Sequence, residues 1–317
     1  IFAFGGLTLI IVMSAISALL WHWRVIPILV NALAVIFKKP LDVGGPVGLS
    51  ATANIFLGQV EAPLLVRPYL ATMSKNELLI LMTVGMSTIA GSVMVIYTTM
   101  LAPIYGLGLI GHFLTASLIS VPAGIMYANM MIPSDTKTDF PADDSSKMYS
   151  STVDAITRGT QSGIDIFLNV AAMLIVVMAL VYLVNAMLGI FPDIQGQPLT
   201  MERIVGWIFA PLAWCMGIPW QESQAAGELL GVKTILNEFV AYIYLADTST
   251  YVLSEKSSLI MLYALCGFAN FSSVGILLSG MSAMVPERRE DLIAVSVKAL
   301  WAALLASCMT GFIVGIL

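Results

Sequence analysis

The chain has 317 residues, of which 59% are hydrophobic and 10% charged, with a formal net charge of −5 at pH 7 and a mean hydropathy of +0.93. An average soluble domain carries about 25% charged residues, so this composition excludes a water-soluble globular protein. No basic patch is present, which argues against a nucleic-acid partner.

Charged residues are missing from four long stretches of the chain, at 1–23, 78–134, 166–192 and 257–286. A helix needs about 20 apolar residues to cross the hydrocarbon core of a bilayer. The first, third and fourth stretches each allow one crossing, and the second is long enough for two. The sequence therefore predicts an all-α polytopic membrane protein.

The N-terminal region predicts one membrane helix followed by a shorter one. Residues 1–21 form an apolar run that ends at Trp21, His22, Trp23 and Arg24, an aromatic and basic edge suited to the headgroup layer. Residues 25–37 are apolar but too short to span, which favours an interfacial helix. Because the first residue is Ile and already lies within an apolar run, we expect N-terminal residues to be missing from this sequence.

The next stretch, NIFLGQVEAPLLVRPY at 54–69, places a carboxylate among helix breakers after the breaker-rich GGPVGLS at 44–50. A charged side chain at membrane depth costs several kcal/mol and normally faces a partner or a cavity. Glu61 could pair with Arg67, but six residues do not match the three- or four-residue spacing of helical neighbours. A re-entrant hairpin with its tip near Gly58 fits better, since irregular backbone at membrane depth needs polar surroundings.

The middle of the chain predicts two spans, a polar segment and a third span. A polar turn at 71–77 precedes spans at 78–102 and 107–131, residues 133–160 are polar and aqueous or interfacial, and residues 163–190 form a long span. Residues 204–220 are apolar but contain Pro211, Gly217 and Pro219, so we expect a broken segment there.

The C-terminal part places Glu238 within the apolar run TILNEFVAYIYLA, before a polar turn at 247–258 and final spans at 259–284 and 291–317. The order of elements resembles that around Glu61, which indicates a weak internal repeat. Duplicated blocks that are interrupted at matching points indicate a transporter binding site near the bilayer midplane.

Two stretches rich in small and polar residues occupy matching positions in these halves, GMSTIAGS at 85–92 and GFANFSSV at 267–274. Small-residue helix packing explains the first equally well. In the second, Asn270 beside Ser272 and Ser273 favours a locally unwound helix, and Phe268 would supply a stacking face.

Enzymes and channels fit this chain less well than a solute transporter. Cys215, Cys266 and Cys308 lie in apolar surroundings without CxxC or metal-ligand spacing, as expected for core filling. His22 and His112 lie far apart in the sequence, and HExxH, GxSxG and GxGD motifs are absent. Nothing in the sequence resembles the filter of a channel.

The motifs GQVEAPLLVRPY, NEFVAY and GFANFSS together resemble those of the concentrative nucleoside transporters, and the resemblance covers essentially the whole chain. It implies a homotrimer in the lipid bilayer of the bacterial cytoplasmic (inner) membrane, with one nucleoside site per protomer. It also implies a scaffold and a transport domain that moves like an elevator.

The resemblance also predicts which residues belong to each domain. The scaffold would comprise 1–40, with a scaffold helix and an interfacial helix, and 133–200, with an interfacial segment and a scaffold helix. The transport domain would comprise repeat 1 at 41–132 and repeat 2 at 201–317. Re-entrant hairpins near 44–72 and 222–246 would be followed by interrupted helices at 77–102 and 257–284.

Site residues follow from the same resemblance. Gln59 and Glu61 would address the nucleobase, partly through water, and between them stands Val60, where relatives often carry a hydroxyl residue. Glu238 would accept hydrogen bonds from the ribose hydroxyls. The remaining predicted substrate contacts are Asn270 and Ser273 at the sugar and Phe268, which would pack against the nucleoside.

For the coupling ion, the resemblance implies Na+ bound by side-chain oxygens of Asn54 and Thr88 and by the backbone carbonyls of Leu57 and Ile89. Unwound carbonyls and hydroxyls suit a small hard cation. The predicted function is nucleoside import, for example of uridine, by Na+ symport, without enzymatic activity or an organic cofactor. Alternatives are coupling to H+ through Glu61, transport of another small polar solute, and a non-transporting receptor or enzyme.

Overall fold

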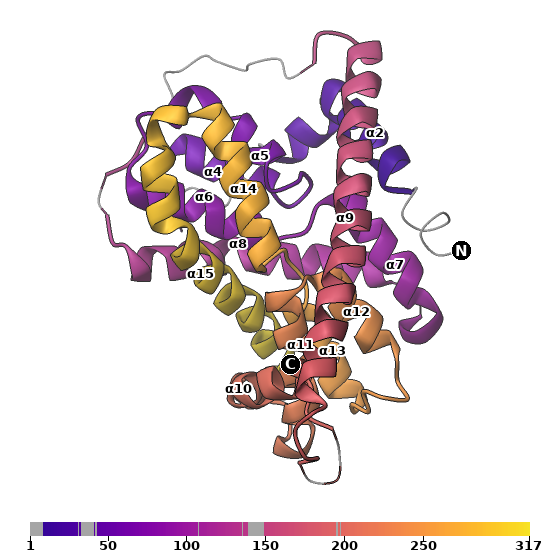
Figure 1. The fold of residues 1–317 in the computed structure, drawn as a ribbon. Helices are drawn as coiled ribbons and strands as arrows, with labels where there is room; N and C mark the ends of the chain where they lie inside the picture. The colour runs from indigo at the N-terminus through magenta and orange to yellow at the C-terminus, as the bar shows by residue number, and fades with distance from the viewer. Residues whose placement is uncertain are drawn as a thin grey trace.

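The computed structural model describes residues 9–30, 32, 41, 43–106, 108–134, 136–138, 149–194, 196 and 198–317. Every element in these ranges is a helix (Figure 1). The predicted all-α class is therefore confirmed. Residues 1–8, 31 and 33–40, which include part of the predicted first span and interfacial helix, lie outside the described residues.

Helices α2 (Leu9–His22) and α9 (Thr152–Leu188) lie side by side at one edge of the molecule (Figure 1). Their backbones approach closely at two glycines of α9. A Cβ atom on Gly159 would lie 2.7 Å from Cβ of Ala18, and one on Gly163 would lie 2.6 Å from Cα of Ile11. Small residues four positions apart allow such contacts between membrane helices.

Helix α9 is longer than the sequence predicts. It begins at Thr152 rather than 163, because Ser151 caps its N-terminus by accepting a hydrogen bond from the backbone N–H of Asp154 at 3.1 Å. The expected polar segment at 133–160 thus includes the first turns of this helix. At 1.5 Å per residue its 37 residues extend about 55 Å, more than the roughly 30 Å of the hydrocarbon core.

The first predicted hairpin consists of α4 (Gly45–Ala53), an irregular turn, the short α5 (Glu61–Leu64) and the 3₁₀ turn η1 (Arg67–Tyr69). Pro46 lies in the first turn of α4, where its missing N–H leaves no intrahelical bond unmade. Ser74 then starts the next helix with a capping box shared with Glu77.

That next helix is interrupted, as the pattern at 85–92 allows. Helix α6 (Lys75–Ser87) ends before 88–90, where Thr88 and Ala90 have extended backbone, and α7 (Gly91–Tyr105) continues the chain. The backbone N–H of Gly91 donates to the carbonyl of Phe56 at 3.1 Å. The break is therefore attached to the turn of the first hairpin, which simple helix packing does not explain.

Helix α8 (Leu109–Met131) completes the first half, and the second half begins with α10 (Met201–Cys215) and α11 (Trp220–Ile235). The axes of α10 and α11 differ by 118°. The break expected within 204–220 lies at 216–219, where Gly217 has φ of +94°. Pro211 lies inside α10 and does not end it.

The second hairpin is α11, a break at 236–237, and α12 (Glu238–Ala246). Helices α13 (Glu255–Ala264) and α14 (Phe271–Met284) form the second interrupted helix, followed by η2 (Pro286–Arg288) and α15 (Arg289–Ile316). The two breaks meet: a Cβ atom on Gly267 would lie 2.6 Å from the carbonyl oxygen of Ser87. The same elements therefore occur in the same order in both halves.

One apolar core joins these halves, with α15 packed against α6, α8 and α13. Within the described residues, three helical segments are long and apolar enough to cross a membrane, namely Lys75–Tyr105, Leu109–Met131 and Pro286–Ile316, and the bent pair α10 and α11 could make a fourth. This agrees with a polytopic membrane protein.

Candidate functional site

Glu238 begins α12, directly after the break in the second hairpin. Asn237 caps the helix by accepting a hydrogen bond from the backbone N–H of Val240 at 2.9 Å. The Glu238 side chain is therefore directed from a helix start rather than from a helix interior. It is 6% exposed, so its carboxylate depends on protein partners.

Two side chains from other elements donate to this carboxylate. The hydroxyl of Tyr97 on α7 donates to Oε1 at 2.8 Å, and Nδ2 of Asn270 donates to Oε2 at 2.8 Å. Asn270 is also the N-cap of α14, because its Oδ1 accepts the backbone N–H of Ser273 at 2.7 Å. The structure thus brings together Glu238, Asn270 and the buried Ser273.

Tyr97 is a residue that the sequence reasoning missed. Its ring is fully buried between the rings of Phe113, Phe239 and Tyr242. A buried tyrosine hydroxyl normally finds a hydrogen-bond partner, and a tyrosine in the middle of the apolar segment 91–105 was the available signal. Sequence alone does not identify the partner, since Glu238 lies 141 residues away.

The tip of the first hairpin carries the other predicted substrate contacts. Gln59 is 9% exposed, and its Oε1 has no hydrogen-bond partner among the described residues. Glu61 is half-buried, and its Oε2 accepts the backbone N–H of Gly58 at 2.9 Å. Nε of Arg67 lies 3.4 Å from the carbonyl of Met284 instead, so the structure does not support a Glu61–Arg67 pair.

A second group missed by the sequence reasoning lies near Glu61. Tyr149 precedes α9, and burial followed by the nearby Glu61 charge raises the pKa of its hydroxyl to about 12. Tyr149 therefore remains a neutral hydroxyl at physiological pH. It adds a donor from the connection between α8 and α9 to the surroundings of the first hairpin.

Helix α14 touches both groups of site residues. Its first residues include Ser273, and further along it passes the hairpin tip, where a Cβ atom on Gly280 would lie 2.7 Å from Cγ1 of Val60. Phe268 is partly buried within the break that precedes α14. Glu61 and Glu238 thus have separate hydrogen-bond partners but belong to units that meet at one helix.

The four predicted cation ligands lie around the first break. Asn54 and Thr88 are the C-cap residues of α4 and α6, and Leu57 and Ile89 lie in the adjoining irregular backbone. All four are at most 5% exposed. Asn54 donates through Nδ2 to the carbonyl of Ser50, which leaves its Oδ1 without a partner in the part of the chain that the structure describes.

This orphaned amide oxygen is chemically suited to a cation. A buried acceptor without a hydrogen bond costs about 1–3 kcal/mol, and a hard cation such as Na+ is bound by oxygen ligands of this kind. The residues present therefore fit the group that the sequence predicts.

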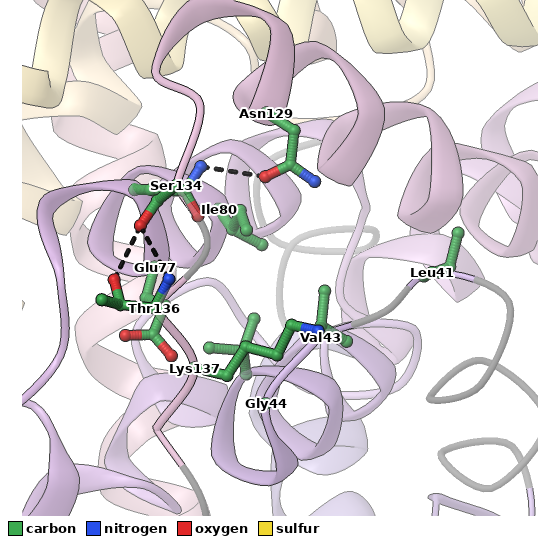
Figure 2. Close-up of a pocket in the computed structure, with 11 residues that line it drawn as sticks. Leu41, Val43, Gly44, Glu77, Ile80, Asn129, Ser134, Thr136 and Lys137 are labelled. Carbon is green, nitrogen blue, oxygen red and sulfur yellow. Dashed lines mark hydrogen bonds between the residues drawn. The ribbon is translucent and has the colours of Figure 1, made fainter.

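A separate cavity of about 180 Å³ lies between α4, the start of α6 and the end of α8. Figure 2 shows its lining, with Glu77 and Asn129 near Ser134 and Thr136. Glu77 accepts hydrogen bonds from the backbone N–H and the hydroxyl of Thr138, at 2.7 and 3.0 Å. None of the predicted substrate or cation residues lines this cavity, so it lies apart from the site.

Two family profiles match the sequence. Residues 112–315 match the profile described as Na+ dependent nucleoside transporter C-terminus, and residues 3–104 match one described as nucleoside recognition. The nucleoside permease NupC of Helicobacter pylori is 34% identical over 321 residues, which cover 100% of this chain and 75% of that protein. Human solute carrier family 28 member 3 is 35% identical, over 100% of this chain and 48% of that protein.

Solved structures agree with these matches. CNTnw in an inward-facing substrate-bound state superimposes with a TM-score of 0.91 at 34% identity, covering 100% of this chain and 75% of that one. A variant of CNTnw in an outward-facing state gives a TM-score of 0.89 at 34% identity, with 100% and 76% covered. The chain therefore belongs to the concentrative, Na+-dependent nucleoside transporter family, whose members are membrane transporters rather than enzymes.

Proposed function

We propose that this protein imports nucleosides, for example uridine, by symport with Na+ and alternating access. The observation that carries the proposal is the buried Glu238 carboxylate, oriented by Tyr97 and Asn270 at 2.8 Å each. Both orienting groups come from other elements, so the carboxylate is fixed before any ligand arrives. Family membership and the geometry of this group support the same function.

The chemistry of Glu238 fits a ribose. An ionised carboxylate only accepts hydrogen bonds and has about four acceptor positions, of which Tyr97 and Asn270 occupy two. The 2′ and 3′ hydroxyls of a ribose are neighbouring donors that match the remaining two. Such charge-assisted hydrogen bonds are roughly twice as strong as neutral ones. Ser273, close to Asn270, completes the proposed sugar contacts.

The first hairpin supplies the proposed nucleobase contacts. Gln59 offers a buried Oε1 without a partner among the described residues, and Glu61 offers its remaining acceptor positions. Val60 contributes no hydrogen bond and packs toward Gly280. We assign Phe268 to van der Waals contact with the nucleoside, since it is partly buried in the second break.

We propose Na+ as the coupling ion, held by Asn54 and Thr88 side-chain oxygens and by the carbonyls of Leu57 and Ile89. The unpaired Oδ1 of Asn54 supports this choice. The hydrogen bond from Gly91 to Phe56 links the first break to the hairpin that carries Gln59 and Glu61. A cation bound there would therefore order the substrate-binding hairpin.

We further propose a homotrimer in the cytoplasmic membrane of a bacterial cell. Residues 1–40 and 133–200 would form the scaffold, and 41–132 and 201–317 the transport domain. The close glycine contact between α2 and α9 supports a rigid scaffold, and relatives solved in inward- and outward-facing states support a moving domain.

Uptake into proteoliposomes tests the function and the ion together. Labelled uridine is offered with an inward Na+ gradient, with choline replacing Na+ at fixed pH, and with an inward proton gradient alone. We expect accumulation only with Na+. Accumulation driven by protons but not by Na+ would contradict the ion assignment and favour Glu61 as the proton carrier.

A competition panel separates nucleosides from other solutes. Unlabelled nucleosides should inhibit uptake, whereas free nucleobases without a sugar and amino acids should not, because Glu238 is assigned to the ribose. Inhibition by amino acids but not by nucleosides would overturn the substrate class. Binding of nucleosides without accumulation would indicate a receptor.

A further inference from the structure

Lys233 is a fully buried cation to which the proposed transport function assigns no role. It lies in the last turn of α11, is 0% exposed and belongs to an apolar part of the chain. Lysine is almost never fully buried unless it is paired. An ionisable side chain at membrane depth is expensive and usually has a functional partner.

Two hydrogen bonds place the ammonium group at the second helix break. Nζ donates to the carbonyl oxygen of Ala264 at 2.8 Å and to Oγ of Ser307 at 2.7 Å. Ala264 is the last residue of α13. The free carbonyls at a helix C-terminus carry a partial negative charge, so Lys233 fixes the end of α13 against α11 and α15.

The same ammonium group lies across the hairpin break from Glu238. Lys233 is in the last turn of α11 and Glu238 is the first residue of α12, so their opposite charges flank the break of the second hairpin. The other titratable groups around the pair are Tyr97 of α7, Tyr242 of α12, Cys266 in the second break and Cys308 of α15. Among these described neighbours, Lys233 carries the positive charge.

We propose, on the basis of the role given above to Glu238 in nucleoside binding, that Lys233 is a positioning residue whose fixed positive charge keeps the Glu238 carboxylate ionised when no nucleoside is bound. A neutral carboxylic acid would hold a proton on one of its acceptor oxygens and would bind the sugar hydroxyls less well. Lys233 thus prepares the site without touching the substrate.

The experiment compares Lys233→Gln with Ser307→Ala in the full-length protein. Glutamine keeps an N–H donor for Ala264 but removes the charge, whereas Ser307→Ala removes one hydrogen-bond partner of Lys233 and keeps the charge. The uridine dissociation constant is measured by calorimetry across a pH series at saturating Na+. A structural role for the hydrogen bonds alone would make the two variants similar.

We expect Lys233→Gln to bind uridine about tenfold more weakly at neutral pH, because a carboxylate that loses a nearby positive charge binds a proton more readily. The affinity of this variant for uridine should recover as the pH rises and the proton is lost. Ser307→Ala should keep the wild-type pH profile. Wild-type affinity and pH profile in folded Lys233→Gln would overturn the proposal, as would an equal shift in Ser307→Ala.

A stability cycle covers the case in which Lys233→Gln does not fold. The double variant Lys233→Gln with Glu238→Gln removes both charges, so it should have a higher midpoint of thermal unfolding than Lys233→Gln alone. If the second substitution gives no such recovery, Lys233 does not balance Glu238 and the proposal is wrong. If recovery occurs but Glu238→Gln alone binds uridine normally, the charge balance stands and the proposed ribose role fails.

Discussion

The two halves of the molecule share a plan but complete their helix breaks differently. In the first half, the break after α6 is bonded to the hairpin turn through Gly91 and Phe56, and Asn54 at the start of that turn has an Oδ1 without a partner among the described residues. In the second half, α13 ends at Ala264, whose carbonyl accepts a hydrogen bond from Lys233 at 2.8 Å. One break thus offers oxygen ligands, and the other already contains a positive charge from its own chain.

This difference has a physical cause and a consequence. The carbonyl end of a half-helix at membrane depth is stabilised by a positive charge. If the first break binds Na+ from solution, as proposed, the degree to which it is ordered depends on the Na+ concentration. The second break always contains the ammonium group of Lys233. Ion binding would therefore change the hairpin with Gln59 and Glu61 and leave the group around Glu238 unchanged.

The carboxylates of Glu61 and Glu238 also differ in how deeply they are buried and in which groups hold them. Glu61 is half-buried and is held by the backbone of its own turn, through Gly58. Glu238 is buried and is held by Tyr97 and Asn270, from two other elements. Glu238 is therefore the more rigidly held of the two carboxylates.

The largest predicted effect comes from Glu238→Gln. The amide cannot accept on both sides, so it conflicts with the donors Tyr97 and Asn270 and with the sugar hydroxyls. Losing two hydrogen bonds to a charged group, at about 1.5–3 kcal/mol each, lowers affinity by about a hundredfold or more. Uridine binding by calorimetry and uptake into proteoliposomes measure this loss.

Glu61→Gln is the matched variant in the other half. It keeps a carbonyl acceptor for the N–H of Gly58 and should weaken uridine binding by roughly tenfold, the equivalent of about 1.4 kcal/mol. Equal losses of uridine affinity in the two variants, or a larger loss in Glu61→Gln, would show that Glu238 does not contribute more to uridine binding than Glu61.

The next effect concerns the point where the two breaks touch. Gly267 has φ of +115°, and a Cβ atom there would lie 2.6 Å from the carbonyl oxygen of Ser87. Gly267→Ala should lower the free energy of unfolding by about 1–3 kcal/mol for the backbone strain alone. Thermal unfolding in detergent measures the change.

Gly275→Ala provides the control, because Gly275 lies in α14 and a Cβ atom there meets no atom within 4 Å. It should be neutral or stabilising by about 0.5–1 kcal/mol, the usual gain from glycine to alanine within a helix. A Gly267→Ala variant as stable as Gly275→Ala would show that the breaks do not pack tightly.

Much of the fold could be predicted because the breaks have local causes. Charge-free stretches predict the spans, and Asn270 followed by Ser272 and Ser273 predicts an unwound helix, since these side chains cap helices rather than extend them. Asn270 indeed caps α14. Proline and glycine also predicted a break within 204–220, but the structure places it at 216–219 because Pro211 is accommodated inside α10.

Contacts across long sequence separations were the part that could not be predicted. Tyr97 and Lys233 reach Glu238 and Ala264 only after the chain has folded, and neither position shows a local pattern that names its partner. The start of α9 was also missed, because hydropathy marks the buried length of a helix rather than its polar first turns. The sequence therefore carries no signal for the groups that hold Glu238 and the end of α13 in place.

A further prediction addresses the ion dependence of the first half. Asn54→Ala removes the unpaired Oδ1 and should raise the Na+ concentration for half-maximal uridine uptake by about tenfold, as expected from losing an oxygen ligand worth about 1.4 kcal/mol. Uridine uptake at saturating Na+ should remain close to wild type. Unchanged Na+ dependence would place the cation elsewhere and remove the contrast between the two breaks.

The smallest effect concerns the connection between the first half and α9. The hydroxyl of Thr138 donates to Oε2 of Glu77 at 3.0 Å, in addition to the bond from the backbone N–H of Thr138. Thr138→Val keeps the side-chain shape and the backbone bond but loses the hydroxyl bond. The free energy of unfolding should fall by about 1 kcal/mol, since an acceptor with several donors retains most of its hydrogen bonding.

Thr136→Val is the control for this last comparison, because Thr136 is exposed and its hydroxyl pairs with Ser134 rather than with Glu77. Thermal unfolding of the two variants should differ, with Thr136→Val close to wild type. Equal midpoints would mean that the Thr138 hydroxyl contributes no net stability. A drop in uridine uptake by Thr138→Val without a change in midpoint would instead indicate that the bond matters for transport rather than for stability.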